Sequence, residues 1–172
     1  LISLLSNSLG FLLFNVFKIS PNKTASLKSF FSFFDISKPK NLIFDTGIIP
    51  EELIIRGDLK LLKMCLKGIL ENAVKYSPSG GTIFIRVVKS NDGISCEISD
   101  EGPGFSEIAM KNLFKLFRPG EPHMDQNLGV DLTLARLIME EHKGKILIEN
   151  LQAKGAMIRL IFPSGDKTLR IE

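Results

Sequence analysis

The chain has 172 residues, of which 44% are hydrophobic and 24% are charged, and this fits one soluble globular domain with a sizeable core. The formal net charge is only +3, because 22 basic residues are scattered among 19 acidic ones without long runs of one sign. This balance argues against a nucleic-acid-binding surface.

The N-terminal stretch, residues 1–17, is the most apolar part of the chain. Serine, asparagine and glycine interrupt it, and it is too short to cross a bilayer comfortably. It also lacks the basic start of a secretory signal peptide. Residues 1–9 instead predict the end of a helix cut from a longer protein, and residues 13–19 predict a strand. We expect residues 1–18 to be the remnant of an upstream helix with the first strand, and residues 19–172 to form the principal domain.

The rest of the chain alternates between helical and strand-like hydrophobic patterns. The expected elements are, in order, a helix at 25–34, strands at 40–46 and 51–57, a long helix capped by Asp58 and ending near Tyr76, strands at 82–88 and 94–99 joined by an Asp-Gly hairpin, a helix at 107–117, a helix at 128–143 closed by Gly144, and strands at 145–150 and 156–163. This order predicts an α+β fold: a two-layer α/β sandwich with a mixed, mostly antiparallel sheet and helices on one face.

The chain has two cysteines, Cys65 and Cys96, which lack the spacing of a CxxC motif. Both lie in apolar sequence contexts, as unpaired buried cysteines usually do. We expect them to be buried free thiols of a protein in a reducing compartment.

The long helix carries the stretch "GILENAVKYSP" at residues 68–78. Helical spacing places Leu62, Leu66, Ile69 and Ala73 on the face toward the sheet, and Gly68, Glu71, Asn72 and Lys75 on the opposite arc with Tyr76 at its edge. A polar arc of this kind is usually a solvated helix face. It also suits a ligand, because an amide oxygen can ligate magnesium and a lysine offers a point charge to phosphate.

A second polar stretch, "SDEGPGF" at residues 99–105, follows a short apolar strand. Asp100 stands at the end of that strand, and Gly102 and Gly104 flank a proline. Glycine and proline favour a tight turn on their own account. In a ligand site, the Asp100 carboxylate would instead accept a hydrogen bond from an amine, while the glycines would let a flat ligand lie on bare backbone.

These stretches, in this order, resemble the ATP-binding domain of two-component sensor histidine kinases, which belongs to the Bergerat-fold or GHKL superfamily. "ENAVKYSP" is similar to the asparagine box, "DEGPGF" to the first glycine-rich box and "LFKLFR" to the phenylalanine box. "LIMEEHKGKI" looks like the helix and strand start that follow the second glycine-rich box. The ending "KYSP" favours the histidine kinases over the chaperone and mismatch-repair relatives, and the resemblance covers roughly residues 19–165.

The resemblance implies a nucleotide-binding role for each matching position. At the phosphates, Asn72 would ligate the Mg²⁺ that bridges the phosphates of ATP, and Lys75 and Arg118 would contact phosphate. At the adenine, Tyr76 would pack near the ring, Asp100 would accept a hydrogen bond from the amino group, and Gly102 and Gly104 would shape the pocket. Phe114 and Phe117 would anchor the ATP lid, and Gly129 would belong to the second glycine-rich box. Glu71 occupies the position of the base in the hydrolysing relatives. Plain core packing is an equal alternative for Phe114 and Phe117.

The implied reaction is phosphoryl transfer from ATP to a histidine, in which the protein mainly positions reactants and neutralises charge. Neither His123, in the lid segment, nor His142, near a helix end, is placed as the acceptor. We therefore expect the acceptor on an upstream dimerisation domain outside this chain. A response regulator would be the downstream partner, the full-length protein a homodimer, and its location the cytoplasm or the cytoplasmic side of a membrane-bound sensor.

The second glycine-rich box, GxGxGL in the family, departs from its pattern in "NLGVDLTLAR". Asn127, Gly129 and Asp131 occupy the glycine positions, so only the middle glycine remains. A backbone at a helix N-terminus approaches phosphate through its N–H groups, often at angles that favour glycine. Asp131 adds a negative charge, and at about 4 Å from phosphate such a contact would cost on the order of 1–4 kcal/mol. Ala156 also stands where the family usually has a hydroxyl near the adenine.

Three functions remain open on the sequence. The first is an active ATP-binding catalytic domain of a sensor histidine kinase with a variant lid. The second is a pseudokinase domain with weak or no ATP binding that acts as a signalling scaffold. The third is a Bergerat ATPase or serine kinase of another branch, and because fold alone does not decide function, the site must discriminate between them.

Overall fold

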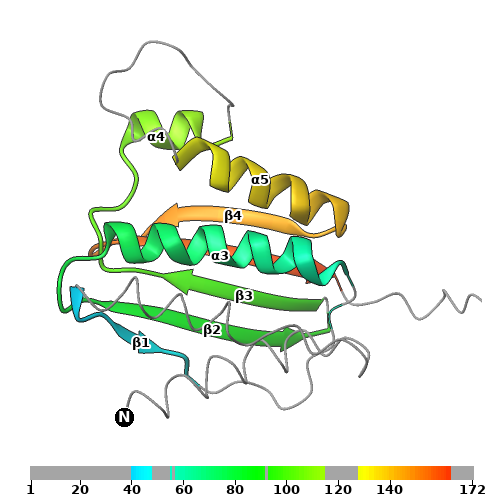
Figure 1. Ribbon diagram of the computed structural model, residues 1–172, viewed down its shortest axis with the longest axis horizontal. Coiled ribbons are helices and arrows are strands. Elements are labelled where there is room, and N and C mark those ends of the chain that lie inside the picture. Colours follow the sequence, from blue (N-terminus) through cyan, green and yellow to red (C-terminus); the bar gives the residue numbers. More distant parts are fainter. Residues whose placement is uncertain (1–39, 48–54, 56, 92, 115–127, 164–172) are drawn as a thin grey trace, which may run out of the picture.

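The computed structural model describes residues 40–47, 55, 57–91, 93–114 and 128–163 of the chain. Figure 1 shows these residues as a sheet with helices over one face. The described elements are β1 (Ile43–Asp45), α3 (Leu59–Tyr76), β2 (Thr82–Ser90), β3 (Gly93–Ser99), α4 (Glu107–Asn112), α5 (Leu128–Glu141), β4 (Lys145–Asn150) and β5 (Ala156–Pro163). The predicted elements at 1–9, 13–19 and 25–34 lie outside the described residues.

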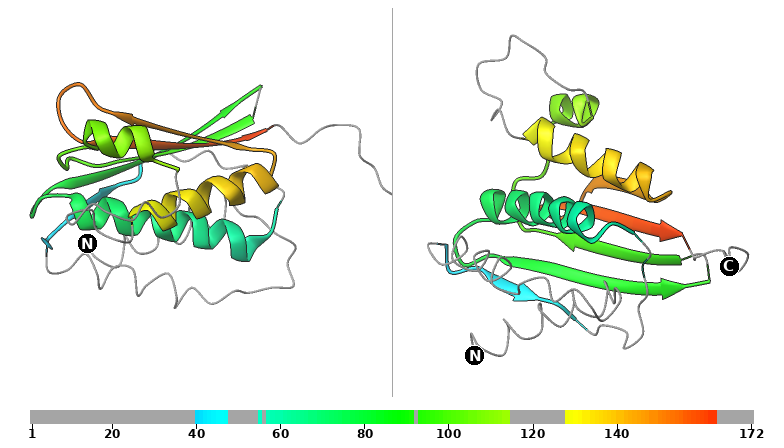
Figure 2. Two further views of the ribbon diagram at one scale, coloured as in Figure 1. Left: turned by 90° about the horizontal axis from the view of Figure 1, so that it is seen from above. Right: turned by 45° about the vertical axis from the view of Figure 1, so that its right-hand side comes forward.

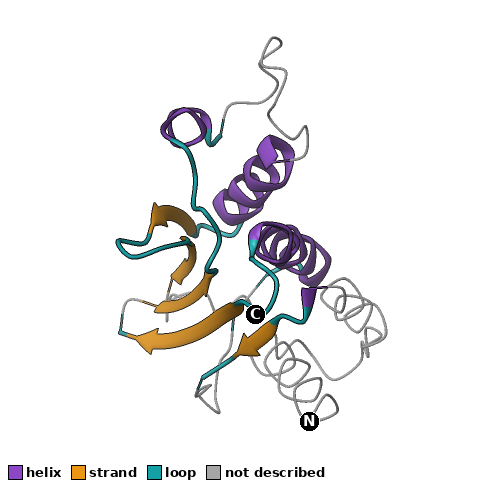
Figure 3. Cartoon of the chain, turned by 90° about the vertical axis from the view of Figure 1, so that its left-hand side faces the viewer, coloured by secondary structure: helices purple, strands orange, loops and turns teal. Residues whose placement is uncertain are grey.

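The described strands form one five-stranded sheet in the order β1-β2-β3-β5-β4. β1 runs parallel to β2, and the other neighbouring pairs are antiparallel. The two long helices, α3 and α5, lie on the same side of the sheet when the molecule is viewed from above or end-on (Figures 2 and 3). This arrangement confirms the predicted two-layer sandwich with a mixed, mostly antiparallel sheet.

The core lies between the sheet and the two long helices. From α3, the side chains predicted to face the sheet, Leu62, Leu66, Ile69 and Ala73, are all buried. Alternate residues of the strands meet them, so that burial follows a period of two along β2 and β5. The sheet, α3 and α5 share one core, whose fully buried side chains include Leu62, Ile83, Leu132, Met139 and Leu160.

Both cysteines belong to this core, as predicted. Cys65 of α3 and Cys96 of β3 are buried free thiols. Burial raises the pKa of each thiol to about 12, so neither is a thiolate at neutral pH. Among the described helices, none combines the length and the apolar character needed to cross a membrane.

The start of α3 is tied to the end of α5. Asp58 is the N-cap, as predicted, and its carboxylate accepts hydrogen bonds from the backbone N–H groups of Lys60 and Leu61. The backbone N–H of Asp58 donates to Nε2 of His142 over 2.9 Å, while Nδ1 of His142 lies 2.7 Å from the carbonyl oxygen of Ile138. These two contacts assign the proton to Nδ1 and hold the ring as a link between the helices.

The end of α5 differs in detail from the prediction that Gly144 closes the helix. Lys143 carries the left-handed conformation, with φ of 54°. Its N–H donates to the carbonyl of Glu140, and the N–H of Gly144 donates to the carbonyl of Met139. This pair of bonds is the Schellman arrangement with lysine at the position that glycine usually takes. Gly144 is needed for space instead, because a Cβ there would lie 2.6 Å from the carbonyl oxygen of Ile161.

Several predicted boundaries are wrong. Of the strand expected at 40–46, only Ile43–Asp45 is a strand, and Asn41 has a positive φ of 51°. Ile55 is buried but lies outside any strand, and most of the strand predicted at 51–57 falls outside the described residues. α4 ends at Asn112, short of the predicted end at 117, and the side chain of the C-cap residue Leu113 packs against the core. The hairpin strands extend further than predicted, to Ser90 and from Gly93.

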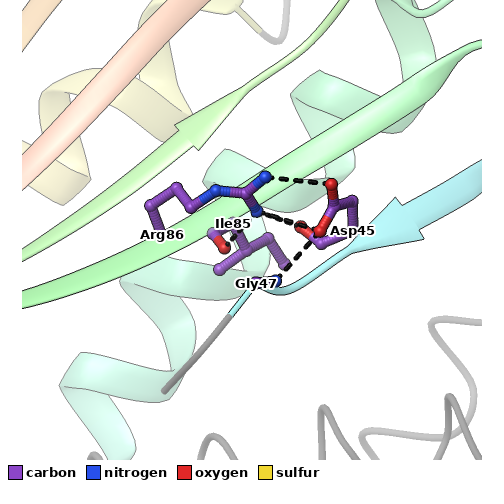
Figure 4. Close-up of polar contacts among 4 residues, drawn as sticks. All are labelled: Asp45, Gly47, Ile85 and Arg86. Carbon is purple, nitrogen blue, oxygen red and sulfur yellow. Dashed lines mark hydrogen bonds and ion pairs between the residues drawn. The ribbon is translucent and has the colours of Figure 1, made fainter. Parts of the chain in front are cut away.

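β1 is short, and an ion pair anchors it to β2. The guanidinium of Arg86 binds both carboxylate oxygens of Asp45, at 2.9 and 3.1 Å, and also the carbonyl oxygen of Asp45 (Figure 4). The hydrogen bond from Arg86 lowers the pKa of the Asp45 carboxyl, and the hydrogen bond from the backbone N–H of Gly47 lowers it further. Since 40% of the Arg86 side chain and 43% of the Asp45 side chain are exposed, the pair fixes geometry more than it adds stability.

Adjacent substitutions at the end of α5 should change stability in opposite directions. His142→Ala removes two hydrogen bonds and should lower the free energy of unfolding by about 1–3 kcal/mol. Lys143→Gly relieves a left-handed backbone and should raise it by up to about 1 kcal/mol. Urea denaturation followed by circular dichroism measures both. A neutral effect of His142→Ala would contradict the proposed link between α3 and α5.

Candidate functional site

The last turns of α3 carry most of the residues predicted to bind a nucleotide. Asn72 does not lie on a solvated helix face, which was the alternative to a ligand site in the sequence. Its side chain is buried, with 7% exposed, and its amide nitrogen has no hydrogen-bond partner in the described part of the chain. A buried amide without a partner is costly and rare, and it requires an explanation such as a ligand or water.

The neighbours of Asn72 are more accessible. Lys75 is exposed, and its ammonium lies 5.3 Å from the centre of the Tyr76 ring, within the range of a cation–π contact. Tyr76 is half-buried. Glu71 lies 3.6 Å from the ammonium of Lys67, one turn earlier, in a solvent-accessible ion pair. This turn therefore presents a cationic and an aromatic group beside the buried amide.

Asp100 leaves the end of β3, as predicted. Its backbone N–H donates to the carbonyl of Ala156 in β5, and its carboxylate accepts a 2.7 Å hydrogen bond from the N–H of Gly102. Burial raises the pKa of the Asp100 carboxyl, while the backbone groups of Gly102 and Ala156 oppose that shift. A half-buried acceptor held by backbone contacts suits the recognition of a ligand amine.

The structure brings the Asp100 loop against the end of α3. A Cβ at Gly102 would lie 2.7 Å from the carbonyl oxygen of Tyr76 and 2.7 Å from Oδ1 of Asp100. Only glycine allows this approach. Two sequence-predicted stretches, one ending at Tyr76 and one starting at Asp100, thus form a single surface.

Two residues that sequence analysis missed hold this loop in place. The side-chain amide of Asn150 accepts from the N–H of Phe105 and donates to its carbonyl, at 2.7 and 2.8 Å, and it lies close to Gly104. Gly155 has φ of 97°, and a Cβ there would lie 1.8 Å from the carbonyl oxygen of Asp100. An asparagine at a strand end and a glycine before the next strand are the signals in the sequence, but neither names its partner.

The second glycine-rich stretch lies at the start of α5. The helix begins at Leu128, as predicted, so Gly129 and Asp131 both lie in its first turn. The side chain of Asp131 is not among those described. Asn127, Phe117, Arg118 and His123 also lie outside the described residues.

Phe114 and His142 have described surroundings. Phe114 is half-buried, and the guanidinium of Arg136 from α5 lies 5.1 Å from its ring centre. This contact joins the segment that follows α4 to α5. Because Phe114 is only partly buried, it is not part of the fully buried core. His142 is engaged in its link to α3, which agrees with the expectation that it is not a phosphoacceptor.

The donor groups fit a magnesium ion that is carried by phosphates. No cluster of three or more His, Cys, Asp or Glu side chains occurs within the described ranges, so the described side chains offer no metal cage of that kind. Mg²⁺ at nucleotide sites usually keeps waters and phosphate oxygens and takes only one or two protein oxygens. The amide oxygen of Asn72 suits that single contact, whereas its buried amide nitrogen, which lacks a partner in the described part of the chain, suits an oxygen of phosphate or water.

A shallow hollow of about 330 Å³ adjoins the far end of the Asp100 loop, next to Gly104. It is lined by Phe105, Glu107, Met110, Lys111 and Asn150, beside α4. None of the predicted nucleotide-binding residues lines it. We place the candidate site at the end of α3 and the Asp100 loop, where the unpartnered amide and the half-buried carboxyl lie.

Comparison with known proteins assigns this arrangement to a family. The family model described as histidine kinase-, DNA gyrase B-, and HSP90-like ATPase matches residues 57–166. The sensor protein SphS of Synechococcus elongatus is 31% identical over 124 residues, which cover 66% of this chain and 30% of that protein. The sensor protein KdpD of Clostridium acetobutylicum is 37% identical over 119 residues, covering 67% of this chain and 13% of that protein.

The chain therefore spans less than a third of the length of these relatives. Among solved structures, the nucleotide-free catalytic domain of histidine kinase ThkA matches with a TM-score of 0.67 and 23% identity, over 79% of this chain and 89% of that one. ThkA in complex with the response regulator TrrA matches with a TM-score of 0.65 and 23% identity, over 80% of this chain and 39% of that one. At this identity, the structures show a shared fold.

Replacing Asp100 by Asn should stabilise the protein at neutral pH. Asparagine keeps the oxygen that accepts from Gly102 and removes the charge that burial disfavours. Because the folded-state pKa is raised, the penalty is present in full above that pKa and disappears as the pH falls to the ordinary value of 3.8. Urea midpoints should therefore be higher for the variant at pH 7 and converge with the original protein in acid. Glu149→Gln, at an exposed carboxyl of β4, is the control and should leave the urea midpoint unchanged both at pH 7 and in acid. A lower midpoint for Asp100→Asn at pH 7 would refute the argument.

Proposed function

This chain belongs to the histidine kinase-, DNA gyrase B- and HSP90-like ATPase family, and on that premise we propose that it is the ATP-binding catalytic domain of a sensor histidine kinase. The observation that carries the proposal is the buried side chain of Asn72, whose amide nitrogen has no partner in the described part of the chain, on the turn of α3 that meets the Asp100 loop. The sensor proteins among its relatives support the kinase branch over other ATPases of the family.

The residues have separate tasks in this proposal. The Asp100 carboxylate accepts a hydrogen bond from the adenine amino group, and Gly102 and Gly104 give the ring access to backbone. Tyr76 packs beside the adenine, and the Lys75 ammonium lies over Tyr76, from where it reaches a phosphate. Together these contacts place the terminal phosphate for transfer.

The charge on the triphosphate is shared between protein and ion. Asn72 would hold Mg²⁺ through its amide oxygen, and the ion would supply charge neutralisation when it is bound. The N-terminus of α5, with Gly129 in its first turn, offers backbone N–H groups and a positive helix dipole to a phosphate. Phe117 and Arg118 belong to the lid in this proposal, and Glu71 orients or activates the reacting groups.

Phosphoryl transfer demands positioning and charge stabilisation more than covalent chemistry from the protein. The acceptor histidine is supplied by an upstream dimerisation domain, and the phosphoryl group then passes to a response regulator. ThkA has been solved with its response regulator TrrA, which supports a partner of that class. We place the domain on the cytoplasmic side, within a homodimeric full-length protein.

Nothing in the comparisons favours a scaffold without nucleotide. The departures at Asn127 and Asp131 instead predict a weakened affinity in a domain that still binds ATP. Asp131 lies in the first helical turn, where a carboxylate stabilises the helix dipole but repels a phosphate at the same N-terminus.

Calorimetric titration with Mg·ATP tests the proposal. The chain should release or absorb measurable heat and bind one nucleotide. Asp100→Asn should abolish binding, and Asn72→Ala should weaken it by about tenfold or more, since the loss of one charged or metal contact is worth more than 1.4 kcal/mol. Glu149→Gln should bind as the original protein does. Absence of binding at millimolar Mg·ATP in the folded original protein would refute the function.

The charge at Asp131 has its own test. Asp131→Asn and Asp131→Gly should both tighten Mg·ATP binding by about fivefold or more, because each removes a like charge near the triphosphate. Glycine should also lower stability by about 1 kcal/mol, since it weakens a helix, whereas asparagine isolates the charge. Equal affinities for the three proteins, measured by the same titration, would show that Asp131 does not face the phosphates.

A further inference from the structure

Lys40 makes an unusual set of contacts at the end of α3. Its ammonium donates hydrogen bonds to the backbone carbonyl oxygens of Val74 and Ser77, at 3.1 and 3.0 Å, and to that of Lys75 between them. An ammonium has three protons to donate, and all three are used by main-chain carbonyls of one helix end. The residue comes from the segment before β1, more than thirty positions earlier in the chain.

These carbonyls need donors. The last carbonyl groups of a helix have no partner within the helix, and they form the negative end of its dipole. Ser77 uses both its N–H and its hydroxyl on the carbonyl of Ala73, so neither of these donors serves the carbonyls that follow. The positive charge of Lys40 supplies those donors and also complements the dipole.

The backbone around Lys40 is fixed independently of its charge. The N–H of Gly80 donates to the carbonyl of Lys40, and the N–H of Ile43 donates to the carbonyl of Gly81. The segment before β1 is thereby bound to the turn that joins α3 to β2. Lys40 extends from a held position and is not a loose surface lysine.

The turn that Lys40 caps is also the turn that carries the candidate nucleotide site. Asn72, Lys75 and Tyr76 lie within one turn of the capped carbonyls, and the carbonyl of Tyr76 abuts Gly102 of the Asp100 loop. The end of α3 is therefore held between Lys40 on one side and the Asp100 loop on the other. A shift of this turn would move the Asn72 amide and the Tyr76 ring relative to Asp100.

We propose that Lys40 is a positioning residue for nucleotide binding, which acts by fixing the last turn of α3. It touches the main chain of the site and not the nucleotide. This inference rests on the proposed function for its effect on affinity, but its effect on the geometry of α3 is independent of any ligand.

The test compares Lys40→Met with Arg86→Met. Methionine keeps much of the length of lysine and removes its charge and donors. Arg86→Met is the matched control, because it breaks the ion pair to Asp45 that anchors the same N-terminal segment (Figure 4). The described polar and ring contacts of Arg86 are to residues of β1 and β2. Thermal unfolding of the full chain first establishes that each variant is folded.

Two measurements follow. Calorimetry with Mg·ATP should show about tenfold weaker binding for Lys40→Met and unchanged binding for Arg86→Met. Tyrosine fluorescence with acrylamide quenching gives the second measurement without a nucleotide. The chain has one Tyr and no Trp, so its emission reports Tyr76 alone. Quenching should increase for Lys40→Met and stay constant for Arg86→Met.

Lys40→Arg keeps the positive charge but replaces the ammonium by a planar guanidinium with a different donor geometry. It should restore part of the Mg·ATP affinity and part of the protection of Tyr76 from quenching. It also serves if Lys40→Met does not fold. Affinity and quenching that are unchanged in the Lys40 variants would overturn the inference while leaving the proposed function intact. Equal losses in Lys40→Met and Arg86→Met would also overturn it, since they would indicate general destabilisation. Failure of the original protein to bind Mg·ATP, with altered Tyr76 quenching in Lys40→Met, would refute the function and retain the positioning role.

Discussion

The C-terminal turn of α3 is the constraint on which the site depends. One helix end has carbonyls that need donors, a tyrosine carbonyl pressed against a loop glycine, and a buried asparagine amide. The unpartnered amide nitrogen is costly on its own, whereas the other two features are ordinary. In combination they fix how the helix meets the strand that ends at Asp100, and this contact creates a polar surface at the edge of an otherwise apolar core.

The rest of the fold stabilises that arrangement from a distance. α5 packs beside α3 over the sheet, and the His142 ring joins the end of one helix to the start of the other. β5 holds Asp100 through the backbone of Ala156, while Asn150 at the end of β4 holds the loop that follows. The two ends of α3 are thus bound to different parts of the chain, so the helix has little freedom to slide.

Two buried or half-buried polar groups of the candidate site reduce stability in a way that suits binding. Asp100 is half-buried, which disfavours its ionised form, yet an ionised acceptor is what an amine ligand needs. Asn72 has a buried amide nitrogen without a partner in the described part of the chain. Such costs are typical of positions kept for a ligand, because a fold selected for stability alone would satisfy or remove them.

The sequence by itself determined the fold class, the apolar face of α3, the Asp58 cap, the buried cysteines and the family, because these follow from periodicity, capping chemistry and motifs that are local in the chain. It misjudged the extent of β1 and α4, because local patterns place the ends of an element only to within a few residues. Only the tertiary structure decided that Asn72 is buried, that Lys143 and not Gly144 takes the left-handed conformation, and that Lys40, Asn150 and Gly155 hold the site. The reason is physical: a side chain that serves a distant carbonyl leaves no periodic trace, since its partner is chosen by the packing of the sheet and helices.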